Sequence, residues 1–357
     1  MRVAYDNNSF VRSLVWLLDP EFERCPIIVE PDKTDSVDPP FIEKSIVPFR
    51  SAVVLDYHLR FKLPSTLKKD KADVFIGMNH ISLHSKVSQI LVLNDLSILK
   101  QQQYFSKSLA RYYKKKLPAF ISKAKTVIAL SENTKRDIVE RFSVDADSVC
   151  LVQKYHYVLD HPLREDHLIA TKEKYTQGKE YFVYSGKIDA SKNLINMLKA
   201  FSLFKKRQKS NMQFIIVGKL DEKYSNFESE LESYKFKDDV KLITEFTAHD
   251  QSLLIGSAYA MIYSVFVEEI YHPGMRALGM GIPLITNKFP SLPDECLLNV
   301  LQANPLDAAD IAEKMITLFK DERKRSELIN GGLQAIKQFP DKKTGAQLAE
   351  ILSHLKA

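Results

Sequence analysis

The chain has 357 residues, of which 45% are hydrophobic and 27% are charged, and its formal net charge at pH 7 is +6. This length predicts two domains, and the ordinary composition excludes a disordered or fibrous protein. The positive charge suits nucleic acid, anionic lipid or phosphorylated small molecules. Because zinc-finger spacings, aromatic RNA-binding signatures and basic heptad patterns are all missing, we expect no nucleic-acid partner.

Two features of the sequence predict a reduced, intracellular setting. The apolar run at 14–18 is too short for a signal peptide and ends at Asp19 and Pro20, and no stretch of about 18 apolar residues follows it. The cysteines are odd in number, far apart and without metal-ligand spacing. We therefore expect a cytoplasmic protein with three reduced core cysteines, which are Cys25, Cys150 and Cys296.

The first half of the chain alternates short apolar runs with amphipathic stretches, which is typical of parallel strands joined by crossover helices. We expect strands over residues 2–5, 52–55, 74–76, 89–93 and 126–130. The polar stretch 160–166 is the expected interdomain link. The predicted domains therefore cover residues 1–165 and 166–357.

The second half shows the same alternation more regularly. Strands are expected over residues 181–184, 214–217, 240–243, 260–263 and 283–286, and helices over 193–206, 227–234 and 273–280. The final stretch, 344–355, predicts a packed helix whose apolar face is formed by Leu348, Ile351, Leu352 and Leu355. The fold class is therefore α/β, with two Rossmann-like, doubly wound domains.

A strand-to-helix turn in the second half combines a glycine with two lysines. The segment YSGKIDASKNLINMLKAF places Gly186 at the end of a strand, and Lys187 and Lys192 in the loop before a helix. A glycine lets backbone amides approach an anion, a helix start adds partial positive charge, and two lysines can neutralise a diphosphate. A plain surface turn with solvated lysines explains the segment alone equally well.

A second turn carries two carboxylates. The segment FVEEIYHPGMRALGMGIPLIT places Glu268 and Glu269 just after a strand, at the carboxyl edge where ligands bind in open α/β sheets. A carboxylate there can accept hydrogen bonds from sugar hydroxyls. Charge compensation at a helix N-terminus is an equally good explanation.

The segment KSLARYYKKKLPAFISKAK, residues 107–125, mixes seven basic residues with aliphatic and aromatic ones. This mixture resembles an interfacial amphipathic helix. It indicates either a peripheral contact with an anionic membrane surface or an ordinary solvated helix face.

Taken in this order, the segments resemble retaining family-4 glycosyltransferases of the GT-B fold, from about residue 71 to the C-terminus. The family's Gly-Arg pattern with a lysine further on lies over Gly186, Lys187 and Lys192. Other matches are a serine-capped helix in ALSENTKRDIVERFSVDADSV, the strand FIIVGK, the strand and loop SAYAMIYS, and GIPLIT followed by PSLPDE. The resemblance implies two domains facing a central cleft, the first binding the acceptor and the second the nucleotide sugar.

The resemblance also implies retaining transfer of a sugar from a nucleotide diphosphate to a hydroxyl, in surface polysaccharide or glycolipid assembly. Lys187 and Lys192 would hold the phosphates and Glu268 the sugar, which makes Lys192 and Glu268 the catalytic candidates. The acceptor would be a saccharide or a lipid-linked saccharide, and no metal or cofactor is expected. Asn8 and Ser9 lie in the first strand-to-helix turn. They indicate either contacts with the acceptor or a plain loop in which Asn or Ser caps the following helix.

Four departures from the family pattern fall on this site. Lys187 stands where the family has arginine, Arg276 replaces the second glutamate, side chains at 269–271 replace glycines, and Asn94 replaces the histidine before Asp95. An arginine cannot accept hydrogen bonds from ribose hydroxyls. We therefore expect Arg276 at the donor site to contact a phosphate or to pair with Glu268 or Glu269. The departures therefore leave open a catalytically weak or inactive GT-B protein that binds sugar or partners another transferase, and also an epimerase or phosphorylase.

An Asp-x-Asp sequence at Asp145, Ala146 and Asp147 is typical of metal-dependent glycosyltransferases of a different fold. Here it follows a predicted helix that ends near Phe142. We therefore expect a polar turn at this place and no metal site.

Overall fold

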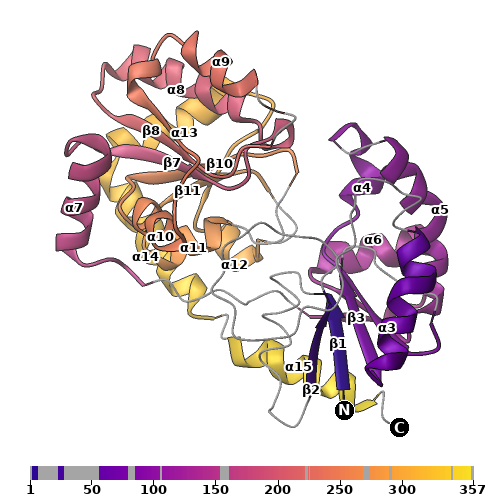
Figure 1. Cartoon of the computed structure of the whole chain (residues 1–357). Coiled ribbons are helices and arrows are strands. Elements are labelled where there is room, and N and C mark those ends of the chain that lie inside the picture. Colours follow the sequence, from indigo (N-terminus) through magenta and orange to yellow (C-terminus); the bar gives the residue numbers. More distant parts are fainter. Residues whose placement is uncertain are drawn as a thin grey trace. The chain divides into compact units, whose positions relative to one another are not determined.

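The computed structural model describes residues 2–6, 23–27, 56–78, 85–104, 107–152, 161–221, 224, 226–267, 273–288, 292–338 and 341–354 (Figure 1). The chain divides into two compact units. Met1–His156 and Pro340–Ala357 form the first, and Tyr157–Phe339 form the second. Each unit contains a six-stranded sheet.

The first sheet has the strand order β2-β1-β3-β4-β5-β6, and its described pairs are all parallel. Its strands are β1 (Arg2–Asp6), β2 (Glu23–Ile27), β3 (Val74–Met78), β4 (Ser88–Leu93), β5 (Thr126–Ala129) and β6 (Val149–Leu151). The helical elements of this unit are η1 (His58–Lys62), α3 (Leu63–Lys69), α4 (Ser97–Lys100), η2 (Gln102–Tyr104), α5 (Lys107–Lys123), α6 (Glu132–Phe142), η3 (Ala146–Ser148) and α15 (Asp341–His354).

Local chemistry explains two of these elements. The Ser131 hydroxyl accepts the Thr134 N–H at 3.1 Å, so the expected serine cap of α6 is confirmed. Asp145 caps η3 by accepting the Asp147 N–H at 3.0 Å, which confirms the expected polar turn. Within the described residues, no group of three or more His, Cys, Asp or Glu side chains could hold a metal ion.

The second sheet has the order β12-β11-β10-β7-β8-β9 and is also parallel. Its strands are β7 (Tyr181–Ser185), β8 (Gln213–Val217), β9 (Val240–Ile243), β10 (Ala260–Tyr263), β11 (Leu284–Thr286) and β12 (Leu301–Gln302). The helical elements are α7 (Glu165–Thr176), η4 (Ala190–Lys192), α8 (Leu194–Gln208), α9 (Asn226–Glu232), η6 (Lys237–Asp239), α10 (Ala248–Gly256), α11 (Pro273–Gly279), α12 (Asp294–Leu297), α13 (Ala308–Lys320) and α14 (Glu322–Ile336).

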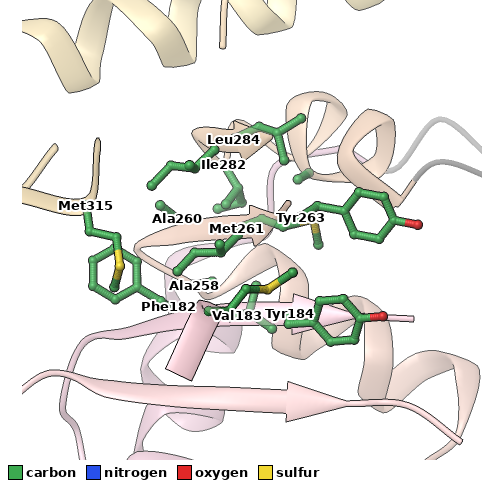
Figure 2. Close-up of a cluster of buried hydrophobic side chains, with 14 of the residues drawn as sticks. Phe182, Val183, Tyr184, Ala258, Ala260, Met261, Tyr263, Ile282, Leu284 and Met315 are labelled. Atoms are coloured by element: carbon green, nitrogen blue, oxygen red, sulfur yellow. The ribbon is translucent and has the colours of Figure 1, made fainter. Parts of the chain in front are cut away.

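Helices cover both faces of the second sheet. In Figure 1, α8, α9 and α13 lie on one face, and α10, α11 and α14 lie on the other. Figure 2 shows how Phe182 of β7 and Met261 of β10 pack with Leu284 of β11 and Met315 of α13. Full burial of one such side chain contributes about 1.5–3 kcal/mol. The strand ends are therefore held by a continuous apolar core.

The elements expected in the second half are confirmed, with small shifts at their ends. In the first half, four of the expected strands correspond to β1, β3, β4 and β5, whereas the strand expected over 52–55 lies outside the described residues. Strands β2, β6 and β12 were not expected. Cys296 is buried and free, Cys150 is half-buried and free, and the Cys25 side chain lies outside the described part of the chain.

Helix α15 groups with the first unit, whereas the sequence led us to place it at the end of the second domain. Leu348 and Leu352 are fully buried, as the apolar stripe predicts. Burial raises the pKa of the Cys150 thiol on β6, and the nearby Glu350 carboxylate of α15 raises it further. The stripe predicted that the helix packs, but the pattern alone does not say which unit it covers.

Candidate functional site

The second sheet reverses its strand order at β7. The chain passes from β7 to β8 and β9 on one side, and then returns to β10 on the other side of β7. In open parallel sheets, the loops after the two strands at such a reversal separate and leave a ligand-binding crevice at the carboxyl edge. The described loops that meet this condition are residues 186–193, after β7, and residues 264–267, after β10.

Gly186 and Gly218 bring the ends of β7 and β8 close together. A Cβ atom at Gly218 would lie 1.7 Å from the Gly186 carbonyl oxygen, so this approach needs glycine. The Gly186 N–H donates to the Val217 carbonyl oxygen at 3.1 Å. The Gly186 N–H is thus hydrogen-bonded to the neighbouring strand β8. Gly186 contributes to the site through the tight shape of the turn.

Lys187 extends from this turn with half of its side chain exposed. Its Nζ donates to Asp221 Oδ2 at 2.5 Å and lies 3.5 Å from Asp189 Oδ2. Partial burial lowers the pKa of the Lys187 amine, but the bond to Asp221 and the charges of both carboxylates outweigh it and raise the pKa above its ordinary value. The amine therefore carries its positive charge at neutral pH and is neutralised by two carboxylates.

Lys192 ends the short helix η4 and is only 4% exposed. Its Nζ donates to the Val267 carbonyl oxygen at 2.9 Å. A buried ammonium is costly unless it is hydrogen-bonded, so this contact is needed to hold it. The alternative of a solvated surface lysine is wrong for Lys192, whose side chain reaches from the loop after β7 to the loop after β10.

Glu268, which is expected to contact the sugar, and its neighbour Glu269 lie outside the described residues. The described chain ends at Val267 on one side of them and resumes at Pro273, the first residue of α11.

Arg276 of α11 contacts α10. Its guanidinium donates to Ser252 Oγ at 2.6 Å and to Gln251 Oε1 at 3.4 Å. Gln251 in turn donates from Nε2 to Ser185 Oγ at 2.9 Å, at the carboxyl end of β7. Arg276 thus links α11 to α10 and, through Gln251, to the strand before the lysine turn.

The candidates of the first unit lie after β4. Asn94 donates from Nδ2 to Asp95 Oδ2 at 2.6 Å, and the Ser97 N–H donates to Asp95 Oδ1 at 2.6 Å. Thr134 Oγ1 donates to the Asn94 carbonyl oxygen at 2.7 Å and fixes this turn against α6. The Asp95 carboxylate is therefore oriented at the edge of the first sheet, whereas Asn8 and Ser9 lie outside the described residues.

Helix α5 places its apolar residues inside the first unit. The buried set consists of Ala110, Tyr113, Leu117, Phe120 and Ile121. Its exposed face carries Lys107, Arg111, Lys114 and Lys115. Most of the apolar side that an interfacial helix would insert into lipid is thus part of the core, and the basic residues are accessible. None of the helices in the described part of the chain is long and apolar enough to cross a bilayer.

Several residues of the site were missed by sequence reasoning. Gly218, Asp189 and Asp221 shape or charge the lysine turn, and Asn193 joins it to the loop after β10. The glycine that ends the strand FIIVGK was an available signal, because such a glycine often marks a close backbone approach. The two aspartates had no comparable signal, since a single carboxylate in a loop is common.

Residues 168–335 match the model of the family described as glycosyl transferases group 1. The O-antigen chain mannosyltransferase B of Escherichia coli is 23% identical over 282 residues, which cover 76% of this chain and 72% of that protein.

Solved structures share the architecture of the whole chain. Sucrose-phosphate synthase of Thermosynechococcus elongatus has a TM-score of 0.79 at 15% identity, covering 99% of both chains. HepE of Anabaena, solved with UDP and glucose, has a TM-score of 0.77 at 14% identity, covering 99% of this chain and 100% of that one. The chain therefore has the GT-B fold, its second unit carries a glycosyl transferase group 1 domain, and the protein is a glycosyltransferase.

Proposed function

We propose that the protein transfers a sugar from a nucleotide diphosphate to an acceptor hydroxyl with retention of configuration, in the manner of family-4 enzymes. The observation that carries the proposal is the placement of Lys187 and Lys192 at the reversal point of the second sheet. This turn lies inside the segment that matches the group 1 glycosyl transferases. A helix start with two cations is a suitable place for a diphosphate.

In this mechanism the bond between the sugar C1 and the diphosphate oxygen breaks, and the electron pair goes to the diphosphate. The acceptor oxygen forms the new bond on the same face of C1, and a donor phosphate oxygen takes the acceptor proton. Lys192 stabilises the growing negative charge from a buried position, where water screens it little. Lys187 moves from Asp221 to the phosphate, and Glu268 orients the sugar, so no metal is required.

The relatives guide the choice of sugar and pathway. Two of them are named as O-antigen chain mannosyltransferases of Escherichia coli and Salmonella typhimurium. We therefore propose mannose as the first donor sugar to test and surface polysaccharide or glycolipid assembly as the pathway. The acceptor is a saccharide or a lipid-linked saccharide, with Asp95 and the turn at Asn8 and Ser9 as candidate contacts.

We also propose a cytoplasmic location on an anionic membrane surface. Helix α5 contains no acidic residue, and its exposed face is basic. Each lysine or arginine held near an anionic leaflet contributes about 1 kcal/mol of attraction. Such a contact would keep the enzyme close to a lipid-linked acceptor.

A thermal-shift screen of nucleoside diphosphates and their mannose and glucose derivatives tests the donor proposal. A ligand at about 100 times its Kd stabilises the folded state by roughly 2.7 kcal/mol, which raises Tm by several degrees. The stabilising donor is then supplied with candidate acceptors, and NMR of the product reports the configuration at C1. Stabilisation by no nucleotide, or an inverted product, would contradict the proposal.

The departures from the family pattern favour one second candidate, a GT-B protein that binds the donor without transferring it. The guanidinium of Arg276 contacts α10, at the position where the family has a ribose-binding glutamate. Nucleotide binding with neither transfer nor donor hydrolysis would support this candidate. An epimerisation assay on the same donor separates it from an epimerase.

A further inference from the structure

The turn after β7 and the loop after β10 are joined by hydrogen bonds that end next to Glu268 in the sequence. The N–H groups of Phe266 and Val267 both donate to the Ser191 carbonyl oxygen, at 2.9 and 3.2 Å. The Lys192 ammonium donates back to the Val267 carbonyl oxygen at 2.9 Å. The loop that leads to Glu268 is therefore attached to the lysine turn itself.

Asn193 adds a contact of a different kind. It is 5% exposed, and its backbone is left-handed, with φ 58° and ψ 23°. Its Nδ2 donates to the Ser264 carbonyl oxygen at 2.8 Å and to the Pro305 carbonyl oxygen at 2.7 Å. Asparagine is one of the few L-residues that adopt this backbone readily, and both of its amide hydrogens are used here.

We propose that Asn193 is a positioning residue that holds residues 264–267, the loop that precedes Glu268 in the sequence, against the lysine turn. Asn193 does not touch the donor in this scheme. Its amide fixes the first residue after β10, and the Ser191 and Lys192 contacts fix the last residues before Glu268. The proposal rests on the proposed function for the role of Glu268, whereas the attachment of the loop is a property of the fold.

The loss of this amide should affect the two acceptors unequally. The Pro305 carbonyl oxygen also accepts from Asn196 Nδ2 at 3.1 Å, so the loop before α13 keeps one bond. The Ser264 carbonyl oxygen accepts from the Asn193 amide, and no second side-chain donor is found for it among the described residues. Loosening should therefore appear in residues 264–267 and be absent from residues 303–307.

The test uses Asn193→Gly, which permits the left-handed backbone without strain and removes only the amide. The matched control is Lys209→Gly, because Lys209 is exposed and left-handed, with φ 49°, at the opposite end of the same helix. Hydrogen–deuterium exchange is measured on the peptides that cover 264–267 and 303–307. Affinity for the stabilising nucleoside diphosphate and kcat for transfer are measured on the same proteins.

In Asn193→Gly the Phe266 and Val267 amides should exchange up to about tenfold faster, the scale set by one hydrogen bond. The kcat value should fall about tenfold while the Kd for the nucleoside diphosphate changes less than about threefold. Lys209→Gly should match the parent in all three measurements. Parent-like exchange in 264–267, or a Kd that rises as much as kcat falls, would overturn the positioning role.

A second variant tests the same proposal if Asn193→Gly does not fold. Asn193→Asp keeps the shape and the left-handed preference, but a carboxylate has no hydrogen to donate to the two carbonyls. It should loosen residues 264–267 at least as much as the glycine variant. If the protein transfers no sugar, the exchange measurement still decides whether Asn193 holds the loop, so failure of the proposed function and failure of this inference give different results.

Discussion

The carboxyl edges of the two sheets are built alike and charged differently. In the second unit, the edge presents the exposed Lys187 amine and the buried Lys192 ammonium. In the first unit, the described edge after β4 presents the Asp95 carboxylate, which is fixed by Asn94 and Ser97. One parallel architecture thus gives a site with two lysines suited to phosphates, one of which is paired with Asp189 and Asp221, and a site with an acceptor group suited to hydroxyls.

The helix starts at the two edges differ as well. The N-cap residue of α6 is Ser131, whose hydroxyl accepts a backbone N–H of the first turn in the ordinary way. The N-cap residue of α8 is Asn193, whose side chain makes no cap bond and is used to hold a neighbouring loop. The N-cap side chain of α8 therefore holds a loop of the candidate site in place, whereas the N-cap side chain of α6 stabilises the helix itself.

The largest expected effect is on donor binding at the second edge. Lys192→Met keeps the buried stem but removes the charge, and should weaken nucleoside diphosphate binding by about 1.5–3 kcal/mol, or roughly 10- to 150-fold. Lys100→Met in the first unit, where Lys100 pairs with Asp137, should leave the affinity unchanged. Calorimetry that gives parent-like affinity for a folded Lys192→Met protein would remove Lys192 from the site.

The close approach at the second edge predicts a loss of stability. Gly218→Ala places a Cβ 1.7 Å from a backbone oxygen, which cannot move alone, and should lower the free energy of unfolding by about 1–3 kcal/mol. Gly331→Ala is the matched control, because its Cβ meets the end of the Asn299 side chain, which can rotate away. Equal melting temperatures for the two variants would show that the strand ends are not held as tightly as described.

The relative effects of substituting Glu268 and Glu269 test the alignment that assigns the sugar contact to Glu268. Glu268→Gln should lower kcat at least about tenfold, or about 1.4 kcal/mol, because it removes the charge that orients the sugar. Glu269→Gln should change little, since only Glu268 is expected to contact the sugar. A reversed order in steady-state kinetics would show that the register at this position is wrong.

A substitution at the carboxyl edge of the first sheet should reduce sugar transfer without changing the affinity for the donor. Asp95→Asn keeps the shape and removes the charge, and should reduce kcat/KM for the acceptor by up to about tenfold. Its nucleoside diphosphate affinity should equal that of the parent, in contrast to Lys192→Met. A loss of donor affinity in Asp95→Asn would contradict the proposal that the second unit binds the donor and the first unit contacts the acceptor.

The smallest effect is expected at the surface of the first unit. Lys114→Gln should weaken co-sedimentation with anionic vesicles by about 1 kcal/mol, the contribution of one charge. Lys116→Gln should have less effect, because Lys116 pairs with Asp56 at 3.5 Å and is less exposed. Absence of vesicle binding by the parent protein would leave α5 as an ordinary solvated helix.

The sequence predicted five of the six strands of the second sheet, β7 to β11, because buried parallel strands are nearly continuous apolar runs. It did not predict β2, which contains Arg24 and Pro26 and lies at an edge, where proline and charge are tolerated. The lysines at 187 and 192 were recognised as a candidate phosphate site. Which of them is buried could not be predicted, because lysine is rarely buried and its partner here is the backbone carbonyl of Val267.

The most direct test of the central claim is hydrogen–deuterium exchange with and without a saturating nucleoside diphosphate that raises Tm. The account predicts slower exchange in residues 186–193, at the edge of the second sheet, and unchanged exchange in residues 94–100, at the edge of the first. Protection of 94–100, or no protection of 186–193 under conditions where the nucleotide raises Tm, would contradict the assignment of the lysine turn as the donor site.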